Sequence, residues 1–149
     1  MTAKRLGRQT VALSDPVSVL SFANIGGKQE ARGPLAGYFD ELNPDAYFGQ
    51  KSWEKGESAM QQFALSRAME KGGITAEEVD CVLAGDLLNQ CIGTSFGLRD
   101  FKIPFYGLYG ACSTMGESLS LAALLIDGDY PILCTYLQTM RKEAEQCVR

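Results

Sequence analysis

The 149-residue sequence contains no histidine. This absence excludes Ser-His-Asp and Cys-His catalysis within the chain, HExxH metalloproteases and most zinc sites. The five cysteines are odd in number and form no C-x-x-C pair, which argues against a disulfide framework and against a metal site built from cysteines. Thiols outside disulfides are typical of a reducing compartment. Neither GxGxxG nor GxxxxGKS/T occurs, so no motif indicates nucleotide binding.

Long apolar runs and an excess of basic charge are also missing. The longest apolar stretch, residues 119–126, is interrupted by Ser120 and is far below the roughly 20 residues that a membrane span needs. The first 16 residues lack the apolar region of a secretory signal. With 14 basic and 18 acidic residues the net charge is −4, which argues against a nucleic-acid partner. We therefore expect one globular domain whose membrane contact, if any, is peripheral or made through a partner.

Strand and helix signals alternate along the chain. Short β-type apolar runs predict strands at residues 17–22, 79–84, 103–109 and 130–136. Helical spacing and capping signals predict helices at 53–71, 75–78, 87–98 and 115–126, with an exposed helix or frayed tail at 138–149. Residues 24–43, rich in glycine, predict a long loop of the kind that often carries function. Because strands alternate with helices, the sequence predicts an α/β fold with parallel strand pairing.

The first candidate site is the turn around Cys112, between a predicted strand and the helix at 115–126. Thr114 and Glu117 match a capping box, which predicts that the helix begins close to Thr114. Unpaired N–H groups at a helix N-terminus stabilise an anion, so they favour a thiolate at Cys112 or a bound carboxylate. The helix is apolar on nearly every face, which predicts that it is buried. In the alternative interpretation, Cys112 is a small residue of the core.

The second candidate site is the segment 84–90, at the carboxyl end of a predicted parallel strand. Ligands bind at this end of the strands in α/β sheets. Asp86, Asn89 and Gln90 offer one carboxylate and two amides, and Cys91 is a further candidate for the same pocket. In the alternative interpretation, Asp86 caps a helix by accepting hydrogen bonds from backbone N–H groups.

Three sequence blocks together resemble the stage V sporulation protein AD family, which consists of thiolase-fold proteins of endospore-forming bacteria. The blocks are GPL at 33–35 with QKSWE at 50–54, AGDLLNQ at 84–90, and KIPF at 102–105 through GACST at 110–114 to LIDG at 125–128. The resemblance implies an αβα layered thiolase-like fold, of which this chain holds about the first half. It implies that Cys112 occupies the position of the thiolase nucleophile. The ligand-binding residues that we infer are Asp86, Asn89, Gln90, Cys112 and Ser113.

The resemblance also implies a function and partners. It implies a condensing-enzyme fold turned to binding dipicolinic acid, during its uptake into the developing spore and its release at germination. The expected partners are dipicolinic acid, alone or as its calcium chelate, small integral-membrane proteins of the same operon, and a second copy in a homodimer. The expected location is the forespore, at the periphery of the inner spore membrane. No cofactor, metal ion or nucleic acid is expected.

Two alternatives stay open. The first is a thiolase-like acyl-transfer enzyme that uses Cys112, although a chain without histidine supplies only the nucleophile, so we expect no turnover. The second is a non-functional fragment. After Gly128 the family pattern ends, which gives a thiolase-like half at 1–128 and a divergent tail at 129–149, as a frameshift or an early stop would produce. Half of a duplicated fold would expose an apolar face that the other half covers.

Overall fold

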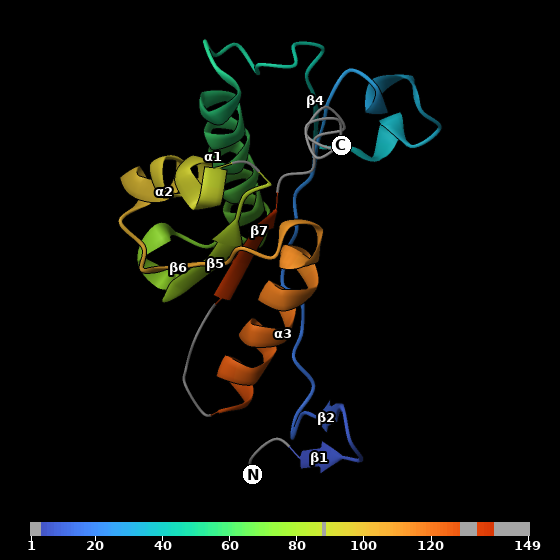
Figure 1. The fold of residues 1–149 in the computed structure, drawn as a ribbon, viewed down its shortest axis with the longest axis vertical. Helices are drawn as coiled ribbons and strands as arrows, with labels where there is room; N and C mark the ends of the chain where they lie inside the picture. Colours follow the sequence, from blue (N-terminus) through green and yellow to red (C-terminus); the bar gives the residue numbers. More distant parts are fainter. Residues whose placement is uncertain (1–3, 88, 129–133, 139–149) are drawn as a thin grey trace.

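A three-stranded parallel sheet forms the centre of the computed structural model, which describes residues 4–87, 89–128 and 134–138 (Figure 1). The strands are β5 (Cys81–Gly85), β6 (Phe105–Gly107) and β7 (Cys134–Gln138), in the order β6-β5-β7. In the described residues the α-helices are α1 (Trp53–Gly72), α2 (Ile92–Leu98) and α3 (Thr114–Asp127). The predicted α/β class with parallel pairing is therefore confirmed.

The longest helix follows the sequence prediction closely. The side chain of Ser52 caps α1 by accepting a hydrogen bond from the backbone N–H of Lys55. The helix ends at Gly73, whose φ of 64° is in the left-handed region that glycine adopts without a steric penalty. The next predicted turn is also present as the 3-10 helix η3 (Ala76–Glu78), with the reciprocal capping box of Thr75 and Glu78.

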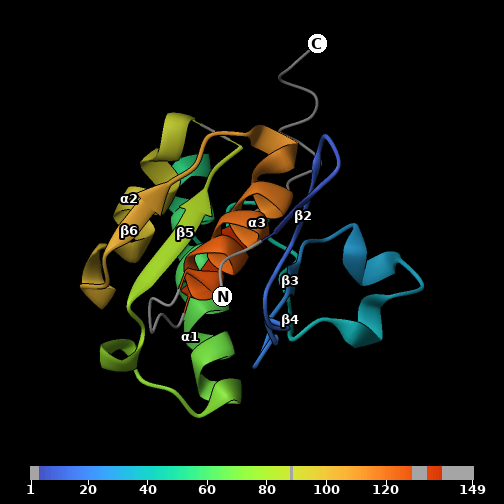
Figure 2. The same cartoon turned by 90° about the horizontal axis from the view of Figure 1, so that it is seen from below.

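The core lies between β5 and the two helices α1 and α2. All five residues of β5 are buried, and Val82 and Ala84 pack with Leu65 of α1 and Leu98 of α2. Side chains alternate between the two faces of a strand, and Gly85 accordingly lies against Thr114 of α3. Helices α1 and α2 therefore cover one face of the sheet and α3 covers the other, as Figure 2 illustrates for β5, which lies between α2 and α3.

The N-terminal part of the chain differs from the prediction. Residues 17–22, predicted to be the first strand, pair with no other strand among the described residues, and Val19 is 71% exposed. A β-type sequence becomes a strand only beside a pairing partner, and no described strand pairs with this segment. Instead, β3 (Ile25–Gly26) pairs in parallel with β4 (Glu41–Leu42) and closes the predicted loop 24–43. That loop contains two 3-10 turns, η1 (Glu30–Arg32) and η2 (Ala36–Tyr38).

A short hairpin that the sequence did not predict precedes this segment. Its strands, β1 (Lys4–Leu6) and β2 (Thr10–Ala12), pair antiparallel around a turn at Gly7. Figure 1 shows the hairpin near the C-terminal end of α3 and far from α1. The backbone N–H of Ser14 donates to the carboxylate of Asp127, which fastens the segment after the hairpin to α3.

Helix α2 starts later than predicted and packs closely on α1. The expected helix 87–98 is divided into the 3-10 turn η4 (Asn89–Cys91) and α2 itself. A Cβ atom at Gly97 would lie only 2.9 Å from the carbonyl oxygen of Ser58, so glycine permits the close approach of the two helices. The last described turn before β6 is η5 (Arg99–Phe101). The parts of the predicted elements at 130–133 and 139–149 lie outside the described residues.

The prediction that α3 is buried was wrong. Only Thr114 and Ser118 of this helix are buried, and Leu121 and Leu124 are 39% and 43% exposed. The helix contacts β5 and β7 with one face. Met115, Leu121 and Leu124 are exposed because no described element covers that side of the helix.

Candidate functional site

The two predicted site segments begin at the same edge of the sheet. Strands β5 and β6 are parallel, with Ala84 opposite Gly107, so the turns that follow them start side by side. The backbone N–H of Leu108 donates to the carbonyl of Ala84 at 2.8 Å. The thiol of Cys91, in the first turn, donates to the carbonyl oxygen of Leu108, in the second, at 3.2 Å. The structure therefore joins the two segments by direct contacts.

The turn that carries Cys112 presents its thiol to solvent. Cys112 lies in the 3-10 turn η6 (Ala111–Ser113), directly before α3, and both Cys112 and Ser113 are exposed. The predicted helix start at Thr114 is confirmed. The alternative that Cys112 belongs to the core is wrong.

The local bonds of this turn differ from the predicted capping box. The residue before the helix, Ser113, makes no side-chain cap bond, and Thr114 is already helical. The hydroxyl of Thr114 accepts from the N–H of Gly110 at 3.2 Å, and the hydroxyl of Ser113 donates to the Gly110 carbonyl at 2.7 Å. The capping box of Thr114 and Glu117 is therefore not formed. Ala111 has a φ of 48°, a conformation that costs a non-glycine residue about 1–3 kcal/mol.

Asp86 points away from solvent. It is 1% exposed, and its carboxylate accepts hydrogen bonds from the N–H of Gly93 at 2.7 Å, from the N–H of Thr94 at 3.0 Å and from the Thr94 hydroxyl. These N–H groups belong to the first turn of α2, so Asp86 caps the helix as the alternative interpretation predicted, although from a position several residues before it. A direct contact between Asp86 and a ligand stays a prediction.

The remaining candidates lie in a turn of unusual backbone geometry. Gln90 and Cys91 are consecutive residues in the left-handed region, with φ of 51° and 69°, and Gln90 is exposed. Burial raises the pKa of the Cys91 thiol, and the nearby negative charge of Asp86 raises it further. The side chain of Asn89 lies outside what the structure describes.

Sequence reasoning missed two buried polar residues of α1, Glu57 and Gln61, each 1% exposed. The side-chain amide of Gln61 donates to the Thr94 hydroxyl at 3.0 Å, and a carboxylate oxygen of Glu57 accepts from the N–H of Leu87 at 3.4 Å. Glu57, Gln61 and the buried Leu65 follow one another at intervals of four residues, which places them on the same face of the helix. A search for apolar residues at helical spacing passed over Glu57 and Gln61 because both side chains are polar.

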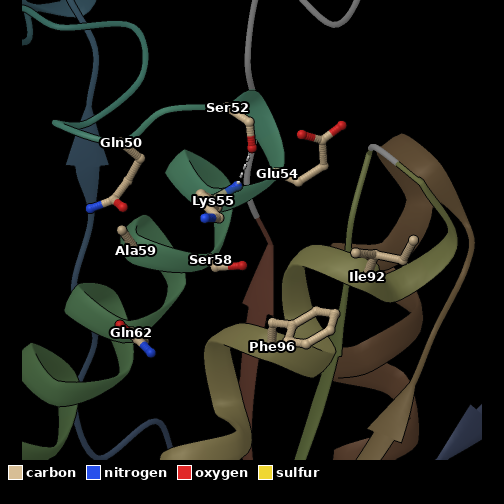
Figure 3. A pocket seen from close by; sticks show the side chains of 9 residues that line it. All are labelled: Gln50, Ser52, Glu54, Lys55, Ser58, Ala59, Gln62, Ile92 and Phe96. Carbon is tan, nitrogen blue, oxygen red and sulfur yellow. Dashed lines mark hydrogen bonds between the residues drawn. The ribbon is translucent and has the colours of Figure 1, made fainter.

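A separate open groove of about 410 Å³ lies between α1 and α2 (Figure 3). Its lining comes from the start of α1 and the outer side of α2: Gln50, Ser52, Glu54, Lys55, Ser58, Ala59, Gln62, Ile92 and Phe96. None of the five predicted ligand-binding residues is among them. In the described ranges no group of three or more acidic or cysteine side chains could hold a metal ion. None of the helices in these ranges is long and apolar enough to cross a bilayer.

Comparison with known proteins gives matches along most of the chain. The family model described as stage V sporulation protein AD matches residues 7–140, beyond Gly128, where we expected the resemblance to end. A curated relative, stage V sporulation protein AD of Bacillus subtilis (strain 168), is 38% identical over 127 residues, which are 85% of this chain. The chain spans about 38% of the length of that relative.

Proposed function

Because the chain belongs to the stage V sporulation protein AD family, we propose that it binds dipicolinic acid during the acid's uptake into the developing spore and its release at germination. The observation that carries this proposal is the exposed turn of Cys112 and Ser113 at the N-terminus of a 14-residue helix. Such a helix end offers N–H groups and a positive dipole to a carboxylate.

The charges around the turn bear on which form of the ligand would bind. Dipicolinate is a planar dianion at neutral pH, so a facing carboxylate would repel it. Asp86 does not face the turn's exposed side, because its carboxylate is buried against Gly93 and Thr94. The carboxylate of Glu117 lies beside Gly110 and adds a negative charge, which favours the calcium chelate over the bare dianion.

The wider setting follows from family membership and is part of the same proposal. We place the chain as the first half of a thiolase-like layered fold with helices on both faces of the sheet. We also propose that it works at the periphery of the inner spore membrane with small integral-membrane proteins of the same operon, and that it pairs with a second copy of itself.

Titration calorimetry with dipicolinate, with and without calcium, tests the binding proposal. We expect the chain to bind, and we expect Cys112→Asp to weaken binding at least tenfold, because the new carboxylate repels the ligand at the helix end. Ser120→Asp, an exposed position on the same helix, is the matched control and should bind as the unchanged chain does. Absence of binding, or equal weakening by both substitutions, would contradict the proposal.

The strained turn also suits a second candidate function, acyl transfer through Cys112. This proposal is supported by the exposure of Cys112 after the left-handed Ala111, because an exposed cysteine is a residue that can attack a thioester. We propose that no turnover occurs, because the chain has no histidine to move protons. Incubation with an acyl thioester should give at most one equivalent of released thiol per chain, with the acyl group found on Cys112 by mass spectrometry. Continuous release would establish an enzyme instead.

A further inference from the structure

A buried polar network joins α1 to the turn after β5. Gln61 donates to the hydroxyl of Thr94, and that hydroxyl donates in turn to Asp86. Glu57 accepts from the N–H of Leu87, directly after Asp86. The side chains of Glu57, Gln61, Asp86 and Thr94 are at most 1% exposed.

Glycine at position 93 brings the two carboxylates of this network close together. A Cβ atom there would lie 3.2 Å from an oxygen of Asp86 and 3.2 Å from an oxygen of Glu57. The hydroxyl of Ser58, the neighbour of Glu57 on α1, donates to the carbonyl of Gly93 at 2.7 Å. The network therefore makes hydrogen bonds to the chain on both sides of residues 89–91: at 86–87 before them and at 93–94 after them.

Residues 90 and 91, between these hydrogen bonds, have a backbone conformation that needs support from its surroundings. Gln90 and Cys91 are both left-handed without being glycine, a conformation that persists only where the surroundings hold it. Cys91 in turn contacts the carbonyl of Leu108, from which the Cys112 turn begins. The two turns are therefore in direct contact through Cys91.

We propose that Glu57 and Gln61 are positioning residues that hold Gln90 and Cys91 in their left-handed conformation, and that they thereby fix these two residues at the ligand site. The statement about the ligand rests on the proposed function, whereas the statement about the turn does not. Among the described residues the buried side-chain oxygen of Gln61 has no hydrogen-bond partner. A buried amide whose oxygen is unsatisfied contributes less to stability than a fully bonded one. The hydrogen bond that Gln61 donates to Thr94 therefore explains the buried glutamine better than a gain in stability does.

The cysteines of the chain provide the readout. Cys91 reports on the turn, Cys112 on the exposed surface and Cys81 on the buried strand β5. Alkylation at pH 8, followed by mass spectrometry of the separate peptides, gives a rate for each thiol. We expect Gln61→Leu to raise the Cys91 rate at least fivefold and to leave the Cys81 and Cys112 rates and the melting temperature unchanged. Gln62→Leu, one residue away on α1 and outside the network, should change none of them.

A second variant, Glu57→Gln, keeps an acceptor oxygen for Leu87 and removes a charge. Because that charge helps to raise the pKa of Cys91, the midpoint of its alkylation against pH should fall. Unchanged Cys91 behaviour in both variants would overturn the proposal. A parallel rise at Cys81 would overturn it too, since it would mark general unfolding.

Dipicolinate binding by the same variants separates this inference from the proposed function. If the unchanged chain binds, Gln61→Leu should weaken binding at least fivefold, and an unchanged affinity would contradict the role of Gln61 at the ligand site. If the unchanged chain does not bind, the proposed function fails, while the alkylation rates still decide whether Glu57 and Gln61 hold the turn.

Discussion

At the scale of single residues, the site depends on close backbone approach as much as on functional side chains. Gly85 ends β5 at the point where both turns and α3 converge. A Cβ atom there would collide with the carbonyl oxygen of Leu108 and would lie 3.0 Å from the side chain of Thr114. The absence of a side chain at position 85 lets the Cys112 turn lie directly against the sheet.

Gly85→Ala should therefore destabilise the chain by about 3 kcal/mol, because the added methyl group must displace backbone atoms that cannot rotate away. Urea unfolding measures this difference. Gly116→Ala in α3 is the control, since its Cβ atom would meet nothing within 4 Å. That control should be stabilising by about 0.5–1 kcal/mol, because alanine favours the helix. A neutral Gly85→Ala would mean that the two turns do not approach as described.

At the scale of elements, α3 follows the candidate turn of Cys112, and within the described residues only one of its faces is covered. Its first residue, Thr114, is buried beside the sheet, whereas Leu121 and Leu124 further along are partly exposed. The apolar sequence predicts a helix covered on every side. Only the packing decides that a single face is covered within the described part of the chain.

Leu121→Gln should cost less than about 1 kcal/mol in this chain, because the side chain is already 39% exposed. Leu65→Ala, at a fully buried position of α1, should cost about 2–5 kcal/mol. Thermal or urea unfolding of both variants compares the two helices. Equal costs would show that α3 is covered in solution.

At the scale of the whole molecule, polar contacts attach residues 21–40 to α1. Asp40 accepts two hydrogen bonds from Lys71, at 2.9 and 3.1 Å, and one from the N–H of Asn24. Ser21 donates to the carbonyl of Ala68 at 2.7 Å, and the ammonium group of Lys71 lies 4.7 Å from the ring centre of Phe22. Asp40 therefore links the loop 24–43 to the helix that supports the site.

The stabilising effect of Asp40 should depend on pH. The hydrogen bond from Lys71 is the main cause that holds the pKa of Asp40 below its ordinary value. A carboxyl group with a lowered pKa in the folded protein stabilises it above the unfolded pKa, about 3.9, and this effect disappears as the pH falls through the folded pKa. Asp40→Asn should therefore lower the urea midpoint at pH 7 and make a smaller difference at pH 3. If Asp40→Asn lowers the urea midpoint equally at pH 3 and pH 7, the stabilisation by Asp40 comes from packing and not from its charge.

The sequence by itself determined the elements whose signals are local. The caps of α1, the box at Thr75 and the buried strand β5 are set by residues within a few positions of one another. The start of α3 at Thr114 was predicted correctly, although the capping box on which that prediction rested is not formed. The alternation of strands and helices also predicted parallel pairing, which puts the carboxyl ends of the strands at one edge of the sheet.

Only the tertiary structure decided where the side chains point and which apolar segments are covered. Asp86 turns inward to cap α2, and Glu57 and Gln61 of α1, more than twenty residues earlier in the chain, bond to its neighbours Leu87 and Thr94. Within the described part of the chain, residues 17–22 have a strand's composition but no neighbour to pair with, and α3 has a buried helix's composition but only one covered face. Pairing and burial depend on groups that are distant in sequence, so no local pattern could predict them.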